Sequence, residues 1–185
     1  VLWLVCCIPL VTIGASTTAA FSVAGKMAAK DDYFIIRDFL AALKRDWKQA
    51  TVLWGILAVA AVLIVTDYQI GLANSGSLGG ALIAVSAALG VCLISMVGAS
   101  FSLLGRFCYP GVRAVLTDAV RLCLANPATM LLWLGLVLWL PVSYYFIPAV
   151  FFYLRLPWLF LGGGTCITAF SFAIRPFFRK LEKKR

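Results

Sequence analysis

The chain has 185 residues, of which 63% are hydrophobic and 12% are charged, with a mean hydropathy of +1.01 and a net charge of +9. Because a soluble domain carries roughly a quarter charged residues, this composition excludes a soluble enzyme, a disordered chain and a secreted disulfide scaffold, and it predicts an integral membrane protein. The basic residues lie in loops and a tail between apolar runs, which favours anionic lipid headgroups over nucleic acid as their partner.

Five apolar runs predict an all-α fold: a polytopic transmembrane helix bundle that forms a single membrane domain over residues 1–185. Each run reaches the roughly 18–20 residues that a helix needs to cross a hydrocarbon core about 30 Å thick. Pro141 and Pro148 interrupt the fourth run, which favours a kink or a shorter span there, and Gly162–Gly164 loosen the fifth. The predicted spans are residues 3–24, 50–67, 79–104, 128–151 and 157–176.

The sequence of the first span allows two interpretations of its topology. It contains Pro9 and Gly14 but no charged residue ahead of the apolar run, so it does not resemble a signal peptide. The chain begins with Val1 rather than Met, and we expect the natural start to lie upstream. A full crossing and a re-entrant hairpin broken at Pro9 and Gly14 both remain open.

Between the first two spans, residues 32–49 predict an amphipathic helix at the membrane surface. Its predicted apolar face is Ile36, Phe39, Leu40, Leu43 and Trp47. The candidate residues for docking to lipid or to a partner, on its charged face, are Arg37, Lys44, Arg45 and Lys48. Residues 112–125 repeat the pattern more weakly, with Val112, Val115, Leu116, Ala119 and Cys123 opposite Arg113, Thr117 and Arg121. An ordinary solvated loop helix is the alternative for both segments.

Small and polar residues mark other surfaces of the predicted spans. The third span has a candidate helix-packing stripe at Ala84, Ala88, Cys92, Ser95, Ala99 and Ser102, spaced three or four apart. Such stripes let helix backbones approach closely, within the bundle or against another protein's helices. The first span has a polar cluster at Thr12, Ser16, Thr17, Thr18 and Ser22. Asn126 followed by Pro127 predicts the start of the fourth helix.

The distribution of basic residues predicts the orientation. The loops after the first and third spans and the basic tail, residues 175–185, hold 15 of the 16 Lys and Arg residues, and the opposite side holds only Arg155. By the positive-inside rule, these loops and the C-terminus are cytoplasmic. Lys26, Arg106 and Arg175 end the first, third and fifth spans, where they are expected to anchor the helices at the membrane interface.

The sequence contains an internal similarity that predicts a parallel repeat, and we call this similarity the echo. A shift of 80 residues places Ala19–Lys26 on Ala99–Arg106, and a third similar segment, Ala169–Arg175, ends the last span. The unit would be a span, a cytoplasmic amphipathic helix and a second span. Whether the echo reflects true duplication stays open, because an apolar composition produces such matches by chance.

The inventory of reactive side chains is poor. The chain has no His, and its only Glu is Glu182, so imidazole-based catalysis and proton relays are excluded. The six cysteines show no CxxC spacing; they are Cys6, Cys7, Cys92, Cys108, Cys123 and Cys166. Asp67 is the only acidic residue that touches a span, at its outer end, where it is an interfacial residue or a partner contact. We therefore expect no enzyme, and no catalytic residue, metal or cofactor.

The segment Ile8–Ala19, read as IPLVTIGASTTA, resembles the YesL family of bacterial integral membrane proteins, a domain of unknown function (number 624). Arg37–Phe39, Lys44–Ala50 and Asn126–Pro127 fit the same family, although Asp46 stands where the family pattern has Asn. The resemblance implies a multi-pass protein of the bacterial cell membrane, with genes that often neighbour those for sugar-import permeases. It brings no established activity or catalytic residue.

Two functions follow as hypotheses. The first is a non-enzymatic accessory or regulatory component of carbohydrate uptake, with anionic lipid and sugar-import permease subunits as partners and no nucleic acid. The alternative is a small channel or transporter that acts alone or as a homo-oligomer. Because no span carries a charged residue at its centre, ion-coupled transport is disfavoured, whereas passive flux is not.

Overall fold

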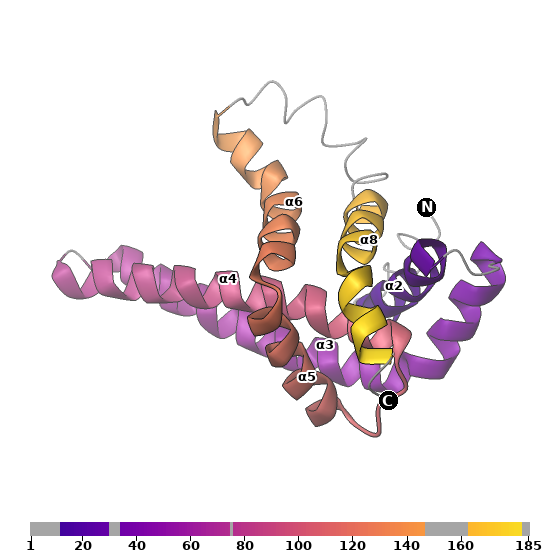
Figure 1. Ribbon diagram of the computed structural model, residues 1–185. Coiled ribbons are helices and arrows are strands. Elements are labelled where there is room, and N and C mark those ends of the chain that lie inside the picture. The colour runs from indigo at the N-terminus through magenta and orange to yellow at the C-terminus, as the bar shows by residue number, and fades with distance from the viewer. Residues whose placement is uncertain (1–11, 30–33, 75, 147–162, 183–185) are drawn as a thin grey trace.

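The computed structural model describes residues 12–29, 34–74, 76–146 and 163–182, with the side chains of 140–146 and 176–182 left aside. These ranges contain helices and no strand, which confirms the predicted all-α class. The helices are α2 (Ile13–Ala29), α3 (Ile35–Ala73), α4 (Ser77–Arg106), α5 (Val112–Ala125), α6 (Pro127–Phe146) and α8 (Gly163–Glu182). Figure 1 shows α3 and α4 side by side as a long hairpin, with α6 and α8 on one side of it and α8 beside α2.

The α3–α4 hairpin contains the two single helices of the described chain that meet the length and hydropathy of a membrane span. Both helices are long and apolar enough to cross a membrane, and they contain the predicted spans 50–67 and 79–104. The chain turns between them at Gly76, whose φ of +155° is rarely adopted by residues with a side chain. Close to the turn, a Cβ on Gly71 would lie 2.9 Å from the Ile83 side chain, so glycine permits the close approach of the two helices.

The predicted surface helix 32–49 is not a separate element. It forms the first turns of α3, which continues without interruption into the predicted second span. The physical reason is local, because Gln49, Ala50 and Thr51 join the two segments without a Pro or Gly that would end a helix. With 39 residues, α3 is about 58 Å long, nearly twice the roughly 30 Å of a hydrocarbon core. Its first turns therefore extend outside the spanning segment.

The chain bends sharply between α5 and α6. The two helices meet at 99°, and α6 begins at Pro127, as the Asn126–Pro127 pair predicts. Taken as one broken span, this pair would raise the number of candidate spans among the described residues from two to three. The count of five stays a prediction, because the spans 3–24, 128–151 and 157–176 extend beyond the described ranges.

Helix α6 continues through Pro141 to Phe146, so Pro141 does not end the helix, and the kink there stays a prediction. Gly163 and Gly164 are helical residues of α8. Pro9, Pro148 and Gly162 lie outside the described residues.

The core lies where α2, α4, α6 and α8 meet. Phe21, Trp133 and Phe170 form an aromatic cluster with ring centroids 5.0–6.0 Å apart. The Trp133 indole Nε1 donates to the Ile94 carbonyl oxygen at 2.9 Å, which satisfies its only polar atom inside the core. A Cβ on Gly98 would lie 2.7 Å from this indole, so glycine makes room for it.

The three echo segments converge on this core. Phe21, Phe101 and Phe170, which occupy equivalent positions in the three copies, are all buried. Gly105 meets α2 so closely that a Cβ there would lie 2.8 Å from the Thr18 carbonyl oxygen. The shared pattern therefore corresponds to a shared packing environment, whereas duplication itself stays a prediction.

Candidate docking site at the basic end of the fold

The first turns of α3 bury one narrow face. Phe39, Ala42, Asp46 and Ala50 are buried, at intervals of three and four residues. Phe39 and Ala42 pack against Ala19 and Val23 of α2. This face fixes the rotation of the helix, so it decides which other side chains point outward.

The predicted apolar face of this segment is divided by the fold. Phe39 is buried and Leu43 packs against the core, so these two members serve the interior instead of the membrane surface. Ile36, Leu40 and Trp47 remain 62%, 44% and 51% exposed. At 100° per residue they fall within about 40° of one another. We call Ile36, Leu40 and Trp47 the apolar stripe.

Basic side chains run beside the apolar stripe. Arg37, Lys44 and Lys48 are exposed and also fall within about 40° of one another, centred about 80° from the apolar stripe. Within the described part of the chain, none of them forms an ion pair. We call Arg37, Lys44 and Lys48 the basic stripe.

Arg45, the fourth predicted docking residue, has a different environment. Its Nε and NH2 groups donate to the Asp46 carboxylate at 2.6–3.1 Å, and Asp46 is only 8% exposed. This hydrogen bonding raises the pKa of the Arg45 guanidinium further above its ordinary value. Arg45 therefore neutralises a buried carboxylate, which the sequence prediction missed because the 3.6-residue pattern does not show which charge faces the core.

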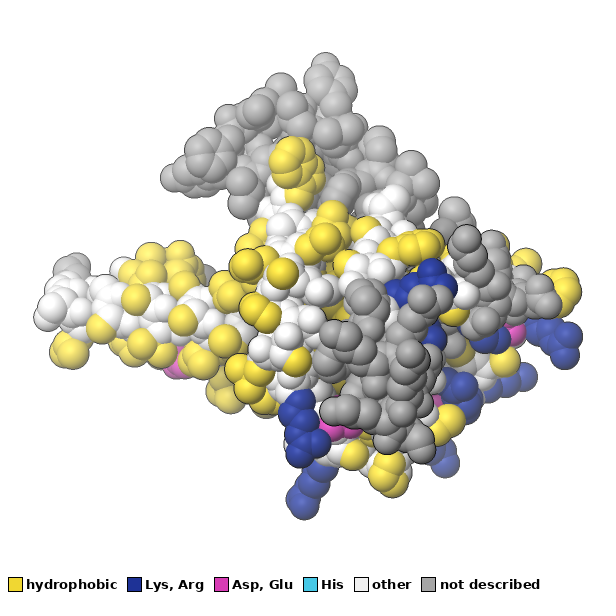
Figure 2. All heavy atoms as spheres, in the orientation of Figure 1, with side chains coloured by type: hydrophobic (Ala, Val, Ile, Leu, Met, Phe, Trp, Pro, Cys, Tyr) yellow, Lys and Arg dark blue, Asp and Glu magenta, His cyan; other side chains and the backbone are white. Residues whose placement is uncertain are grey.

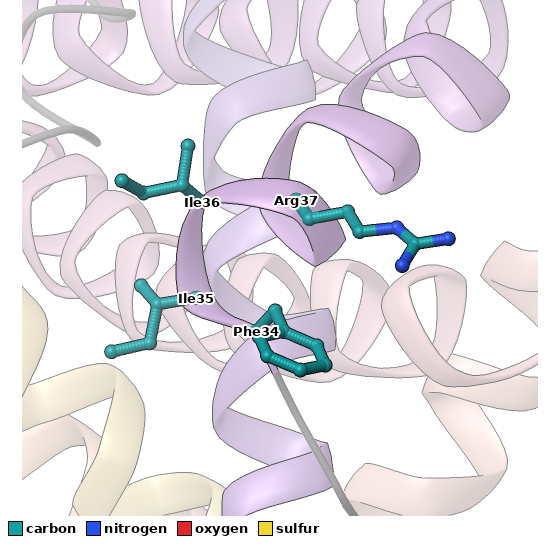
Figure 3. Close-up of a pocket in the computed structure, with 4 residues that line it drawn as sticks. All are labelled: Phe34, Ile35, Ile36 and Arg37. Carbon is teal, nitrogen blue, oxygen red and sulfur yellow. The ribbon is translucent and has the colours of Figure 1, made fainter.

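The exposed apolar surface begins two residues before the predicted apolar face, at Phe34. Phe34 and Ile35 are 70% and 53% exposed, and with Ile36 and Arg37 they line a shallow open hollow. Figure 3 shows Ile35 and Ile36 projecting to one side of the first turn of α3 and Arg37 to the other. The available sequence signal was the apolar run Phe34–Ile36, which follows Asp31, Asp32 and Tyr33.

The Lys26 ammonium links the end of α2 to the start of α3. Its Nζ lies 3.0 Å from the Asp38 carboxylate, which also accepts a 3.0 Å hydrogen bond from the Phe34 amide. The hydrogen bond from Lys26, followed by that amide, lowers the pKa of Asp38 below its ordinary 3.8. Lys26 is thus engaged inside the fold, and its predicted role as an interface anchor stays a prediction.

The other two predicted anchors also contact α2. Arg106 donates to the Gly25 carbonyl oxygen at 3.4 Å, and Arg175 donates to the Ala29 carbonyl oxygen at 3.3 Å. Carbonyls at the C-terminal end of a helix carry partial negative charge, which cations stabilise. Three residues predicted to anchor separate spans are therefore brought together at one end of α2.

The predicted amphipathic pattern of residues 112–125 is also changed by packing. Val115 and Ala119, with Leu122, are buried in the core, and Val112, Leu116 and Cys123 pack against it. This apolar face thus covers the bundle instead of lying in the headgroup region. On the outer surface, Val120 and Leu124 are 44% and 79% exposed, and Arg113 and Arg121 are exposed as well.

A series of side-chain hydrogen bonds connects α5 to α3 through Tyr109. The Gln49 side-chain amide donates to the Tyr109 carbonyl oxygen at 3.0 Å, and the Tyr109 hydroxyl lies 3.3 Å from the Asp118 carboxylate. Asp118 also pairs with Arg121 at 3.3 Å. Arg121 therefore has an acidic partner, whereas no ion pair is formed by Arg113 within the described ranges.

Half of the predicted helix-packing stripe of α4 is buried and the other half is exposed. Ser95, Ala99 and Ser102 are buried. Ala84, Ala88 and Cys92 are exposed, although they belong to the same helix face. The division occurs because α5 and α6 cover only the half of α4 that is close to Arg106.

The polar side chains of α2 are used locally. Ser16 and Thr17 donate to the Ile13 carbonyl oxygen, and Thr18 donates to that of Gly14. Hydroxyls bound to their own helix in this way do not require a polar path through the membrane. Asp67 is exposed on α3 near the far end of the hairpin.

The reactive groups are dispersed in the described part of the chain. No group of three or more Cys, Asp or Glu residues is placed there to hold a metal ion. Cys92 and Cys108 are exposed and Cys166 is buried, and Cys6 and Cys7 lie outside the described residues. Figure 2 shows Lys and Arg side chains gathered at the right and lower parts of the view, and none on the visible far end of the hairpin.

Comparison with known proteins identifies one family. Residues 1–68 match the model of the family described as "Protein of unknown function, DUF624". The predicted family resemblance is confirmed for these residues. The DUF624 match includes α2 and all of α3 except its last five residues, and therefore the apolar and basic stripes. No curated protein and no solved structure matches the chain. The match and the long apolar helices indicate an integral membrane protein of unknown biochemical activity.

Proposed function

We propose that this protein is a non-enzymatic accessory or regulatory component of carbohydrate uptake in the bacterial cell membrane, with its C-terminus in the cytoplasm. It would act by docking through the first turns of α3 to the cytoplasmic membrane surface and to a sugar-import permease. The observation that carries the docking role is the apolar stripe lying beside a basic stripe that makes no ion pair in the described part of the chain.

The geometry suits the boundary between lipid and water. Exposed Ile36, Leu40 and Trp47 would cost free energy in water, about 25 cal/mol for each Å² of apolar surface. Arg37, Lys44 and Lys48 would in turn be costly to place in hydrocarbon, because each is charged. Both requirements are met in the headgroup region, where basic side chains reach phosphates or an acidic partner segment.

The link to carbohydrate uptake is supported by the family resemblance, whose genes often neighbour those for sugar-import permeases. An accessory role also agrees with the sequence, which has no His and a single Glu. The alternative of an independent channel gains no support from α2, because the hydroxyls of Ser16, Thr17 and Thr18 donate to carbonyls of their own helix.

The test is purification from native membranes in a gentle detergent, followed by mass spectrometry of the proteins recovered. We expect sugar-import permease subunits in stoichiometric amount with the unaltered chain, and their loss with the double variant Lys44→Glu/Lys48→Glu. The matched control is Lys183→Glu/Lys184→Glu, which makes the same charge change in the basic tail and should keep the permease bound.

Two results would contradict the proposal. Recovery of a homo-oligomer without permease subunits would contradict the accessory role, and solute flux in reconstituted liposomes would then favour the channel. Equal loss of the permease in both double variants would show that total charge matters rather than the basic stripe. Membrane insertion of each variant is checked by fractionation, because basic loops also direct topology.

A further inference from the structure

We infer that a groove formed by α4, α5 and α6 binds an anionic phospholipid, with one acyl chain in the groove and the phosphate at Arg113. The groove is separate from the stripes on α3 and does not depend on the proposed function. It has a volume of about 400 Å³ and lies where Val91–Met96 of α4 faces the end of α5 and the start of α6.

The groove is built for an apolar occupant. Its walls include Val91, Val120, Met130 and Leu134. Among the described lining residues only Ser95 has a hydroxyl, which donates to the Val91 carbonyl oxygen at 2.9 Å. No polar group of the described lining therefore requires a polar ligand. A flexible hydrocarbon chain fits such a surface because its contacts are non-directional.

The groove opens onto a hydrocarbon-facing surface. At its rim, Leu124 and Leu131 are 79% and 68% exposed. They belong to α5 and α6, on either side of the 99° bend. The bend between α5 and α6 leaves a wedge-shaped space beside α4. If these two helices were straight and antiparallel, direct packing between them would fill this space. In a membrane, lipid is the molecule available to fill this wedge.

A single basic residue gives the groove a polar end. At 100° per residue, Arg113, Val120 and Leu124 fall within about 40° of one another on α5, and Arg113 precedes Val120 by about 10 Å along the helix axis. Arg113 is exposed and forms no ion pair within the described ranges, whereas Arg121 is paired with Asp118. One face of α5 thus carries the Arg113 guanidinium, followed along the helix by the apolar groove. This arrangement is complementary to an anionic headgroup followed by an acyl chain.

The same charge distribution disfavours a second copy of the chain in the groove. A two-fold contact between copies would bring together two surfaces that each carry Arg113 and Arg121 close to the apolar rim. An anionic phospholipid instead supplies the opposite charge, and its chain covers the exposed leucines of the rim.

Two cysteines in the lining report on occupancy. Cys92 and Cys123 line the groove, whereas Cys108 is exposed outside it, between α4 and α5. The purified full chain in detergent micelles is titrated with phosphatidylglycerol or with phosphatidylcholine of the same chains. Alkylation of each cysteine by N-ethylmaleimide is then followed by peptide mass spectrometry.

We expect phosphatidylglycerol to slow alkylation of Cys92 and Cys123 and to leave Cys108 unchanged. Half-protection should need about five-fold less phosphatidylglycerol than phosphatidylcholine, the ratio that one basic side chain near a headgroup provides. Arg113→Gln should remove this preference, and Lys184→Gln, in the basic tail, should retain it. Ala84→Cys adds a reporter on the exposed part of α4 outside the groove, and we expect lipid to leave its alkylation rate unchanged.

Several results would overturn the inference. Equal slowing at Cys92 and at the Ala84→Cys position would show general embedding in lipid rather than a site. A preference for phosphatidylglycerol that survives Arg113→Gln would remove the phosphate contact. Cys92 cross-linked to Cys92 of a second copy under oxidation would assign the groove to a protein interface. No protection by either lipid would leave the groove without a phospholipid.

Discussion

The two ends of α4 are both apolar but have different surroundings. Near Arg106, the α4 residues Phe101, Leu103 and Leu104 are each 1% exposed, because α2, α5, α6 and α8 gather around them. At the far end, Leu78 is 79% exposed. The junction end is therefore held by protein packing, whereas the far end is matched to hydrocarbon. Apolar sequence alone does not distinguish the two, because lipid and protein interior are similarly apolar.

The largest effect is expected for Trp133→Ala at the junction. Trp133 is 7% exposed, contacts Phe21 and Phe170, and donates to a backbone carbonyl. Loss of a buried Trp should lower the free energy of unfolding by about 3–5 kcal/mol, measured by SDS titration in mixed micelles with circular dichroism. The matched control is Trp139→Ala on the same helix, since Trp139 is 57% exposed. Equal destabilisation by both substitutions would contradict the packed junction.

The next effect sets a glycine of the junction against one of the far end. Gly98→Ala would place a Cβ 2.7 Å from the Trp133 indole and should destabilise by about 1–3 kcal/mol. Gly80→Ala meets no atom within 4 Å, and it should stabilise the helix by about 0.5–1 kcal/mol. The same titration checks opposite signs for the two substitutions, and a shared sign would break the comparison between the two ends.

A smaller effect is expected to distinguish Arg45, which pairs with Asp46, from its neighbour Lys44. Arg45→Gln leaves the buried Asp46 carboxylate without its cation, and it should destabilise by about 1 kcal/mol, a value reduced because Arg45 is half exposed. Lys44→Gln, at the adjacent position, should change the free energy of unfolding by less than about 0.5 kcal/mol. If Lys44→Gln were the more destabilising substitution, the assignment of Arg45 to structure and Lys44 to docking would be wrong.

The smallest effect concerns Asp38 and depends on pH. The Lys26 hydrogen bond lowers the pKa of Asp38 in the folded protein, so ionised Asp38 stabilises the fold above 3.8, and this stabilisation is lost as the pH falls through the lowered pKa. Asp38→Asn should therefore lower Tm slightly at pH 7. The difference from the unaltered chain should be absent well below pH 3.8. A difference that persists there would assign the effect to packing and not to charge.

The sequence predicted the helical elements better than their surroundings. The start of α6 at Pro127 followed from local capping chemistry, and the apolar runs that form α3 and α4 followed from hydropathy. The sequence did not predict that 32–49 joins the second span, because the change from charged to apolar residues at Gln49 resembles a boundary although no Pro or Gly ends the helix there. The groove could not be predicted, since its walls belong to three helices whose contacts depend on the 99° bend.

By itself, the sequence determined the membrane class, the all-helical fold and the basic, amphipathic start of α3. These properties depend on composition and on a 3.6-residue period, which are local to a segment. Tertiary structure decided that Phe39 is buried while Trp47 is exposed, that Arg45 pairs with Asp46 while Lys44 faces outward, and that half of the α4 stripe is covered. The reason is that burial depends on which neighbouring helix covers a face, and a repeating pattern within one helix carries no information about its neighbours.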